Sequence, residues 1–266
     1  MPSVDAAGSE LYYKRTGNGE PLLLIQGFTA THLSWGRQFL SRLEESFECI
    51  VFDNRGMGKS GRAKTPFSVL DLVADTLGLP DALEIESAHV LGFSMGGMVA
   101  QELVLRHPER VRRLVLGCTY AGGEGQRLTS QEVAQILAEG MQSGDREQAL
   151  RAAWSVNVSE AFAADPANYD AFHEIAVTKP VAVPVIMRQM QAIAQHDTNA
   201  RLGEITAPTL VVHGTADRML PASNGEAIAK AIPGARYVPL EGVGHMFWTE
   251  QPERSAELIA EHLVQG

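Results

Sequence analysis

Short, continuously apolar runs alternate with longer segments of helical periodicity along this chain, and that alternation limits the fold more than any other feature. Runs without apolar–polar alternation are typical of strands buried on both faces, as in a parallel sheet. The pattern predicts an α/β domain with a mostly parallel central sheet flanked by helices. The expected strands are Pro21–Gln26, Cys49–Asp53, Ala88–Phe93, Val111–Cys118, Pro208–Gly214 and Ala235–Leu240. The expected helices are Ser34–Glu45, Ser68–Leu83, Met95–Arg106, Ala222–Ala231 and Glu250–Leu263.

The alternation of strand-like and helical segments is absent from about Tyr120 to Thr206. No strand-like run occurs there, and four stretches of helical spacing carry Met and aromatic residues. We expect residues 1–119 and 207–266 to form the core domain. Residues 120–206, called the cap segment below, are expected to form a helical cap or lid over one edge of the sheet. Ordinary packed helices are the alternative interpretation, because apolar stripes more often serve a core.

Length and charge narrow the function classes. The 266 residues, 45% of them hydrophobic, suffice for one substantial core. A net charge of -10 without a basic run argues against nucleic acid as a partner. No leader-like segment or apolar run of the ~18 residues that span a membrane occurs, which predicts a cytoplasmic protein without membrane contact. Cys49 and Cys118 lack metal-ligand neighbours in the sequence, so we expect buried, reduced thiols and no metal.

The segment "FDNRGMGKSG", residues 52–61, contains both a G-x-G-x-x-G pattern and the end of a P-loop pattern. A dinucleotide site needs a helix to begin directly after the glycines, and "RAKTP" follows instead. A P-loop would need its first glycine at position 53, which is Asp53. We therefore expect a tight connection in which Gly56 and Gly58 adopt backbone conformations that other residues resist. Asp53 and Arg55 are expected to fix this loop through local hydrogen bonds or an ion pair.

The segment "GFSMGG", Gly92–Gly97, follows an expected strand and precedes an expected helix. This is the context that G-x-S-x-G needs to lift a nucleophilic serine above the sheet, so Ser94 is the candidate nucleophile. The N-terminus of the following helix favours negative charge at that point. A helix-capping serine in a glycine-rich turn is the structural alternative.

A serine hydroxyl needs a base to take its proton and an acid to orient that base. Asp217 and His245 follow Ser94 in the expected order, each in a loop beyond a strand. His32 is the main rival to His245, because it follows the first buried strand. The remaining histidines are expected to pack, cap helices or lie on the surface: His89, His107, His173, His196, His213 and His262.

The tetrahedral intermediate of acyl transfer also needs hydrogen-bond donors for its oxyanion. One N–H would come from the residue after the nucleophile, Met95. The other would come from the loop after "PLLLIQGF", where Phe28 is the best candidate.

These motifs together resemble the α/β-hydrolase superfamily over essentially the whole chain. The segments that carry the likeness are "GEPLLLIQGF", "FDNRGMGKS", "VLGFSMGGMVAQELVLRHPERVRRLVL", "APTLVVHGTADRMLP" and "PGARYVPLEGVGHMFWTEQPE". The chain looks most like small bacterial carboxylesterases and 3-oxoadipate enol-lactonases of the serine branch. The resemblance implies the α/β-hydrolase fold, a triad of Ser94, Asp217 and His245, oxyanion donors Phe28 and Met95, and a helical cap. Many members have His where this chain has Gln26, which we expect to retune the oxyanion loop without abolishing catalysis.

The leading hypothesis is a cofactor-independent serine hydrolase of a small-molecule carboxylic ester or lactone. Hydrolysis of carbon–carbon bonds in diketones, or perhydrolysis, would use the same triad, and a cap arginine such as Arg188 near Ser94 would favour an anionic substrate. A ligand-binding receptor of the same fold is the non-enzymatic alternative, and a homodimer is left open. Candidate pocket walls are Phe28, Trp35, Met95, Trp154, Met187, Met190 and Trp248, each of which also suits a plain core role.

Overall fold

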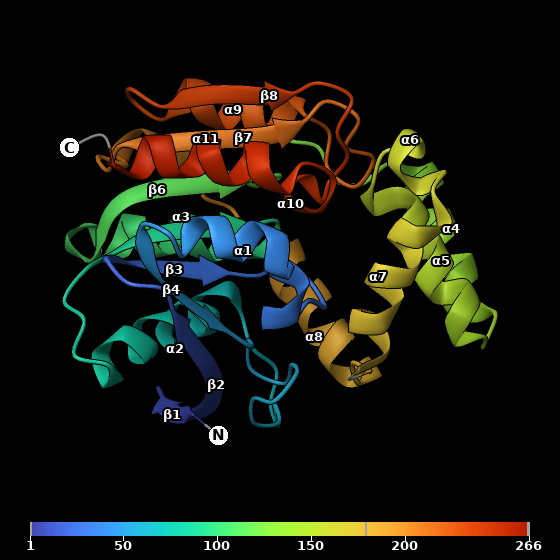
Figure 1. Ribbon diagram of the computed structural model, residues 1–266, viewed down its shortest axis with the longest axis horizontal. Coiled ribbons are helices and arrows are strands. Elements are labelled where there is room, and N and C mark those ends of the chain that lie inside the picture. The colour runs from blue at the N-terminus through green and yellow to red at the C-terminus, as the bar shows by residue number, and fades with distance from the viewer. Residues whose placement is uncertain (1, 179, 265–266) are drawn as a thin grey trace.

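An eight-stranded sheet in the order β1-β2-β4-β3-β5-β6-β7-β8 forms the centre of the protein in a computed structural model that describes residues 2–178 and 180–264 (Figure 1). The pairs β1–β2 and β2–β4 are antiparallel, and every later pair is parallel. The expected mostly parallel sheet is therefore confirmed. The strands are β1 (Ser3–Ala6), β2 (Ser9–Thr16), β3 (Glu20–Ile25), β4 (Phe47–Phe52), β5 (Ala88–Phe93), β6 (Val111–Gly117), β7 (Thr209–Gly214) and β8 (Arg236–Leu240).

The hairpin of β1 and β2 at the sheet edge was not expected from the sequence. Ala7 and Gly8 connect the two strands with φ angles of 51° and 81°. A two-residue connection with positive φ at both positions matches the right-handed twist of paired strands. Gly8 between two short polar runs was the available signal, but edge strands lack the continuous apolar pattern of the interior strands.

Both faces of the sheet are covered, which explains the uninterrupted apolar runs. Along β3, Leu22 and Leu24 belong to one buried cluster, whereas Leu23 and Ile25 belong to the other. Successive strand side chains point to opposite faces, so a strand with two covered faces is apolar throughout. The first cluster includes residues of α1 (Arg37–Leu43) and α11 (Pro252–Val264), and the second includes residues of α2 (Val69–Ala82), α3 (Met95–Arg106) and α9 (Ser223–Ala231).

Two expected helices are shorter than the sequence indicated. A 3-10 turn at His32–Trp35 precedes α1, because Gly36 has a φ of 70° and interrupts the helical backbone. Near the C-terminus, α10 (Phe247–Glu250) ends before Pro252, and α11 begins at that proline. Proline has no N–H to donate and suits the first turn of a new helix.

Between β6 and β7, residues 120–178 and 180–206 form helices and no strand. The elements are α4 (Gln131–Gln142), α5 (Arg146–Asn157), α6 (Glu160–Ala163), α7 (Pro166–Thr178), α8 (Val183–Ala194) and a 3-10 helix at Asn199–Glu204. Figure 1 shows α4 to α7 beyond the carboxyl ends of the parallel strands. Trp154, Val158 and Tyr169 form a small buried cluster of their own there. The division into core and cap domains stays a prediction.

Within the described ranges, no helix is long and apolar enough to cross a membrane.

Candidate active site

A sharp turn between β5 and α3 presents Ser94, whose φ of 54° and ψ of -119° are rare for a residue with a side chain. The turn is tight because a Cβ at Gly96 would lie 2.1 Å from the carbonyl oxygen of Ile25. A Cβ at Gly92 would likewise lie 2.4 Å from the carbonyl oxygen of Gly96. Thr119 Oγ1 donates to the Ser94 carbonyl at 2.7 Å and helps to hold the strained backbone. Backbone strain of this kind is often stored at functional sites.

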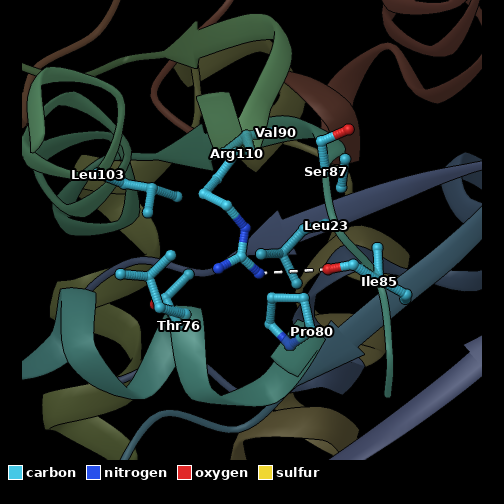
Figure 2. Close-up of a pocket in the computed structure, with 10 residues that line it drawn as sticks. Leu23, Thr76, Pro80, Ile85, Ser87, Val90, Leu103 and Arg110 are labelled. Carbon is cyan, nitrogen blue, oxygen red and sulfur yellow. Dashed lines mark hydrogen bonds between the residues drawn. The ribbon is translucent and has the colours of Figure 1, made fainter. Parts of the chain in front are cut away.

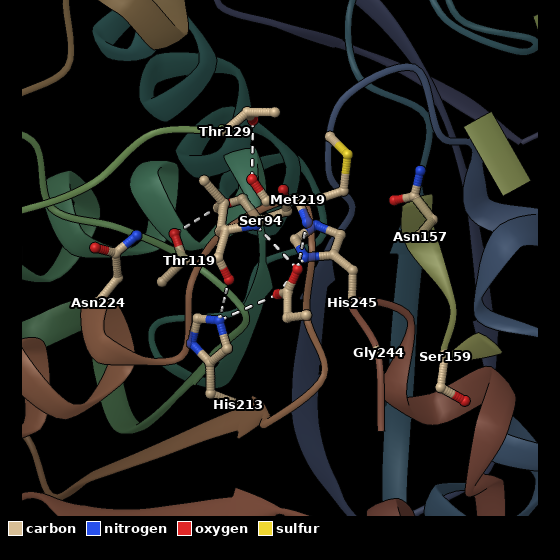
Figure 3. A network of polar contacts seen from close by, with 12 residues as sticks. Ser94, Thr119, Thr129, Asn157, Ser159, His213, Met219, Asn224, Gly244 and His245 are labelled. Carbon is tan, nitrogen blue, oxygen red and sulfur yellow. Dashed lines mark hydrogen bonds and ion pairs between the residues drawn. The ribbon is translucent and has the colours of Figure 1, made fainter. Parts of the chain in front are cut away.

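His245 and Asp217 form a close pair in the loops after β8 and β7 (Figure 3). His245 Nδ1 lies 2.6 Å from Asp217 Oδ2. The other carboxylate oxygen, Oδ1, accepts the backbone N–H groups of Met219 at 2.8 Å and Leu220 at 2.9 Å. His213 Nε2 lies 3.1 Å from the same Oδ2 that contacts His245. Four nitrogen groups, two from histidine rings and two from the backbone, therefore hold the carboxylate.

The electrostatics of this pair suit an acid that orients a base. Burial alone would raise the pKa of Asp217, but His245 and His213 outweigh that effect and hold the pKa well below its ordinary range. An ionised carboxylate only accepts hydrogen bonds, so we assign the proton of neutral His245 to Nδ1. The Nε2 lone pair of His245 is then available to take a proton.

Phe93, the residue before Ser94, packs against His245. The ring centroids of Phe93 and His245 are 4.7 Å apart, and Figure 3 shows Ser94 and His245 in the same close-up. Among the described residues, the Ser94 hydroxyl donates no hydrogen bond. Bonds between a nucleophile and its base commonly tighten only when substrate is present.

The loop after β3 runs directly beside Ser94. A Cβ at Gly27 would lie 3.0 Å from Ser94 Cβ, so Phe28 follows at the expected oxyanion position. The N–H of Met95 belongs to the first turn of α3, where backbone donors have no acceptor within the helix. Gln26 supports the loop, since its Oε1 accepts the Gly27 N–H at 3.0 Å. The oxyanion roles of Phe28 and Met95 stay a prediction.

His32, the rival of His245, forms a separate pair with Asp53 in the loop after β4, and the choice of His245 as the base stays a prediction. Its Nδ1 and its backbone N–H both contact Asp53 Oδ1 at 2.8 Å. Asp53 Oδ2 accepts the Lys59 N–H at 2.8 Å. A Cβ at Gly58 would lie only 2.1 Å from that same oxygen, so the loop needs glycine there.

Asp53 fixes the loop through a local hydrogen bond, as expected, but the expectation that Arg55 also acts locally is wrong. Arg55 instead makes a two-pronged ion pair with Asp75 of α2, with Nε–Oδ2 at 2.6 Å and Nη2–Oδ1 at 2.7 Å. The guanidinium fork matches a carboxylate in this geometry. The glycine prediction is confirmed, because Gly56 and Gly58 have φ angles of 79° and 46°. The loop is thus fixed both by the contact of Asp53 with Lys59 inside it and by partners from α2 and the 3-10 turn at His32–Trp35.

The candidate pocket residues lie in three different environments. Trp35 and Trp248 pack against each other in the core beneath α1 and α11, and their ring centroids are 5.1 Å apart. Trp154 packs within the cluster of the cap segment. Met187 and Met190 lie on α8 with exposed fractions of 55% and 48%. Their role in substrate binding stays a prediction.

A small cavity is present at the other end of the sheet (Figure 2). Leu23, Thr76, Val90 and Leu103 line it, and the Arg110 side chain lies across it with Nη2 3.2 Å from the Ile85 carbonyl oxygen. The cavity borders the beginning of β5, whereas Ser94 follows its end. A strand of this length separates the two by roughly 20 Å, so the cavity does not belong to the candidate active site.

One group of side chains has the composition of a metal site. The ligand atoms of Cys118, Asp217 and His245 all lie within 4.8 Å of one another. Burial raises the pKa of the Cys118 thiol well above its ordinary value, and the negative charge of Asp217 raises it further. A protonated thiol is a poor metal ligand, so the arrangement suits the hydrogen-bonded acid and base better.

Two polar contacts near the site were missed by sequence reasoning. His213 was expected only to pack, although the "HG" at the end of its strand places it close to Asp217. Glu250 was interpreted only as the start of a helix. Its Oε1 accepts the N–H groups of Gly244 and Ser159, both at 2.8 Å, and its Oε2 accepts Ser159 Oγ at 2.6 Å. Glu250 therefore ties the loop of His245 to the cap segment.

Known proteins resemble this chain over nearly its whole length. The protein named "Putative carbamate hydrolase RutD" from Azorhizobium caulinodans is 28% identical over 97% of both chains. The "Putative non-heme bromoperoxidase BpoC" of Mycobacterium tuberculosis is 30% identical over 91% of this chain and 93% of that protein. The crystal structure of the enol-lactonase from Burkholderia xenovorans LB400 superposes with a TM-score of 0.86 and 27% identity, covering 99% of this chain and 100% of that one. The sequence model of the alpha/beta hydrolase family matches residues 22–258. The chain therefore belongs to the alpha/beta hydrolase family.

Proposed function

We propose that this protein is a serine hydrolase that cleaves a carboxylic ester or lactone through an acyl-enzyme on Ser94. The observation that carries the proposal is the 2.6 Å contact of His245 Nδ1 with Asp217, at the same end of the sheet as the strained turn of Ser94. A base held in this way presents Nε2 toward the nucleophile's side. The strained turn supplies a partly exposed hydroxyl at the N-terminus of a helix.

In the acylation step, Ser94 Oγ attacks the carbonyl carbon while its proton passes to His245 Nε2. The N–H groups of Phe28 and Met95 stabilise the oxyanion that forms. Collapse of the intermediate breaks the bond to the leaving oxygen, which takes the proton back from His245. Asp217 stays ionised and stabilises the imidazolium during the step.

In the second step, water attacks the acyl group of Ser94 and gives one proton to His245. That proton returns to Ser94 Oγ when the ester bond breaks. The products are a carboxylic acid and an alcohol, or one hydroxy acid from a lactone. The scheme needs no cofactor.

The names of two relatives support acyl chemistry. An enol-lactonase and a carbamate hydrolase both cleave a bond between a carbonyl carbon and a heteroatom. A carbamate is thus a third substrate class for the same steps. The bromoperoxidase-named relative favours perhydrolysis as the second candidate, in which hydrogen peroxide replaces water in the second step and yields a peracid.

The side chain of Arg188 argues against an anionic substrate. Its guanidinium donates to the carbonyl oxygens of Ala63 and Lys64. A cation engaged by main-chain oxygens is less available to an anionic substrate. This favours a neutral ester or lactone over an enol-lactone acid or a diketone acid, and the complete acid–base pair favours turnover over a receptor role.

The test is hydrolysis of p-nitrophenyl esters from acetate to decanoate, together with a lactone panel, by wild type and Ser94→Ala. We expect turnover that disappears in the variant and a chain-length optimum that reports pocket size. Wild-type turnover no higher than that of the variant on every ester and lactone would refute the proposal. Adding hydrogen peroxide and assaying peracid tests the second candidate.

A further inference from the structure

A buried glutamine of the cap segment contacts the oxyanion loop. Gln189 of α8 has an exposed fraction of 0%, and its Oε1 accepts the backbone N–H of Thr29 at 3.0 Å. Thr29 directly follows Phe28, the expected oxyanion donor. The contact therefore joins α8 to the part of the loop on which the oxyanion hole depends.

The backbone of this loop needs an external constraint. Thr29 has a φ of 57°, in the left-handed region that β-branched residues rarely adopt. Such conformations persist only where the surroundings enforce them. The Gln189 contact is one such constraint, and the loop that it fixes runs so close to Ser94 that a Cβ added at Gly27 would lie 3.0 Å from Ser94 Cβ.

Packing alone does not account for an amide at this position. Gln189 lies on the inner face of α8, between the buried residues Val185 and Ala192. Its Nε2 is buried and has no hydrogen-bond partner among the described residues. An unpaired buried donor is unfavourable, and methionine would fill a similar volume without one. The main favourable interaction of this side chain is therefore the hydrogen bond that its Oε1 accepts from the Thr29 N–H.

We propose that Gln189 is a positioning residue that holds the oxyanion loop through Thr29 and so links the placement of α8 to the rate of acyl transfer. This inference rests on the proposed serine hydrolase function. The inference requires that loss of the Thr29 contact move the Phe28 N–H away from the position in which it donates to the oxyanion. The effect belongs to the transition state, in which the oxyanion forms, and so lowers kcat rather than raising KM.

The experiment compares Gln189→Met, Gln189→Glu and Gln191→Met on the best ester of the panel. Gln191 is an exposed residue of the same helix, so Gln191→Met is the matched control. A buried glutamic acid has a raised pKa and stays neutral, and its carbonyl oxygen can still accept the Thr29 N–H. We measure kcat, KM, the thermal midpoint and the fraction of enzyme labelled at Ser94 by a fluorophosphonate, which corrects kcat for any misfolded material.

We expect Gln189→Met to lower kcat by about 10- to 100-fold, less than the ~10²–10³-fold loss of a whole oxyanion donor, with KM and the thermal midpoint little changed. Gln189→Glu should restore most of kcat, and Gln191→Met should match wild type. Wild-type kcat in Gln189→Met, or equal losses in Gln189→Met and Gln189→Glu, would overturn the inference alone. Absence of Ser94-dependent turnover in wild type would overturn the proposed function, and this inference with it.

Discussion

His213 and His245 contact the same oxygen of the Asp217 carboxylate, at 3.1 Å and 2.6 Å. His213 Nε2 also lies 2.9 Å from the Leu220 carbonyl oxygen. Both of its partners accept hydrogen bonds, so Nε2 of His213 carries a proton. Its Nδ1 is buried without a partner in the described structure. His213 therefore donates to Asp217 and, together with His245, holds its carboxylate in place.

Replacing His213 tests this arrangement. We expect His213→Phe to lower kcat/KM by about 3- to 10-fold, because Asp217 loses a donor and His245 a fixed orientation. Loss of a hydrogen bond to a buried charged group should also lower the free energy of unfolding by about 1.5–3 kcal/mol. Ester kinetics and urea unfolding measure the two effects. His173→Phe, at a half-exposed histidine, should change neither kcat/KM nor stability. Wild-type kinetics and stability in His213→Phe would contradict the role of His213 in holding Asp217.

Glu250 offers a second test, on the link between the His245 loop and the cap segment. Glu250→Ala removes the acceptor of three hydrogen bonds from Gly244 and Ser159. We expect kcat to fall by about tenfold and stability by about 1–3 kcal/mol, because buried backbone donors lose their partner.

Glu250→Gln should stay near wild type, since its amide oxygen still accepts both N–H groups and Ser159 Oγ can accept from its NH₂. The exposed Glu253→Ala is the control for loss of a carboxylate in this region. Equal losses in Glu250→Ala and Glu250→Gln would show that negative charge, rather than hydrogen bonding, matters there.

Gly96 should tolerate no side chain. In Gly96→Ala the new Cβ would lie 2.1 Å from the Ile25 carbonyl oxygen, a backbone atom, so α3 and β3 would have to separate. We expect destabilisation of several kcal/mol, about 3 or more, with loss of activity. Gly203→Ala places its Cβ 3.9 Å from the nearest atom and should be neutral or slightly stabilising. Thermal unfolding of the two variants gives the comparison, which fails if their midpoints agree.

Buried histidines should make folding sensitive to acid. Burial lowers the pKa of His196 and of His262 from 6.5 to about 4 each. The unfolded chain then binds protons before the folded one, so stability is complete above pH 6.5 and is lost as pH falls toward 4. The pKa shift of His196 corresponds to about 3 kcal/mol.

Urea midpoints measured between pH 8 and 4.5 test this expectation. The curve should flatten for His196→Phe, because the buried ring then has no proton to bind. It should be unchanged for His107→Phe, where the side chain is 40% exposed. If the urea midpoint of His196→Phe depends on pH as steeply as that of the wild type, other groups control the acid sensitivity.

The sequence was most informative where burial is two-sided. Parallel strands covered on both faces leave continuous apolar runs, so β3 to β7 could be predicted. The edge strand β8 was also predicted, although only its last residue is buried, and the glycine motif predicted the turn of Ser94. The edge hairpin of β1 and β2 could not, because its side chains are partly exposed. The partner of Arg55 could not either, since Asp75 lies on another element and only packing of α2 brings it close.

In the candidate site, too, residues in local motifs could be predicted from the sequence, whereas residues that act through distant contacts could not. Ser94, Asp217 and His245 follow from motif order and strand ends, and the structure places the last two in contact; their catalytic roles stay predictions. His213, Gln189 and Glu250 were missed because each acts through a contact across the fold. Nothing in a local pattern marks a glutamine as buried or a glutamate as shared by two loops.

The contacts of the cap segment also bear on how such proteins can diverge. Ser159 is bound to the loop of His245 through Glu250, and the Asn157 carbonyl accepts the Met246 N–H at 2.9 Å. At the far end, α8 is bound to the loop of Thr29. A cap transplanted from a relative would break both attachments unless Glu250 and Thr29 found partners in the new sequence. The unit that can be exchanged without loss of activity is thus the cap together with the two loops that it touches.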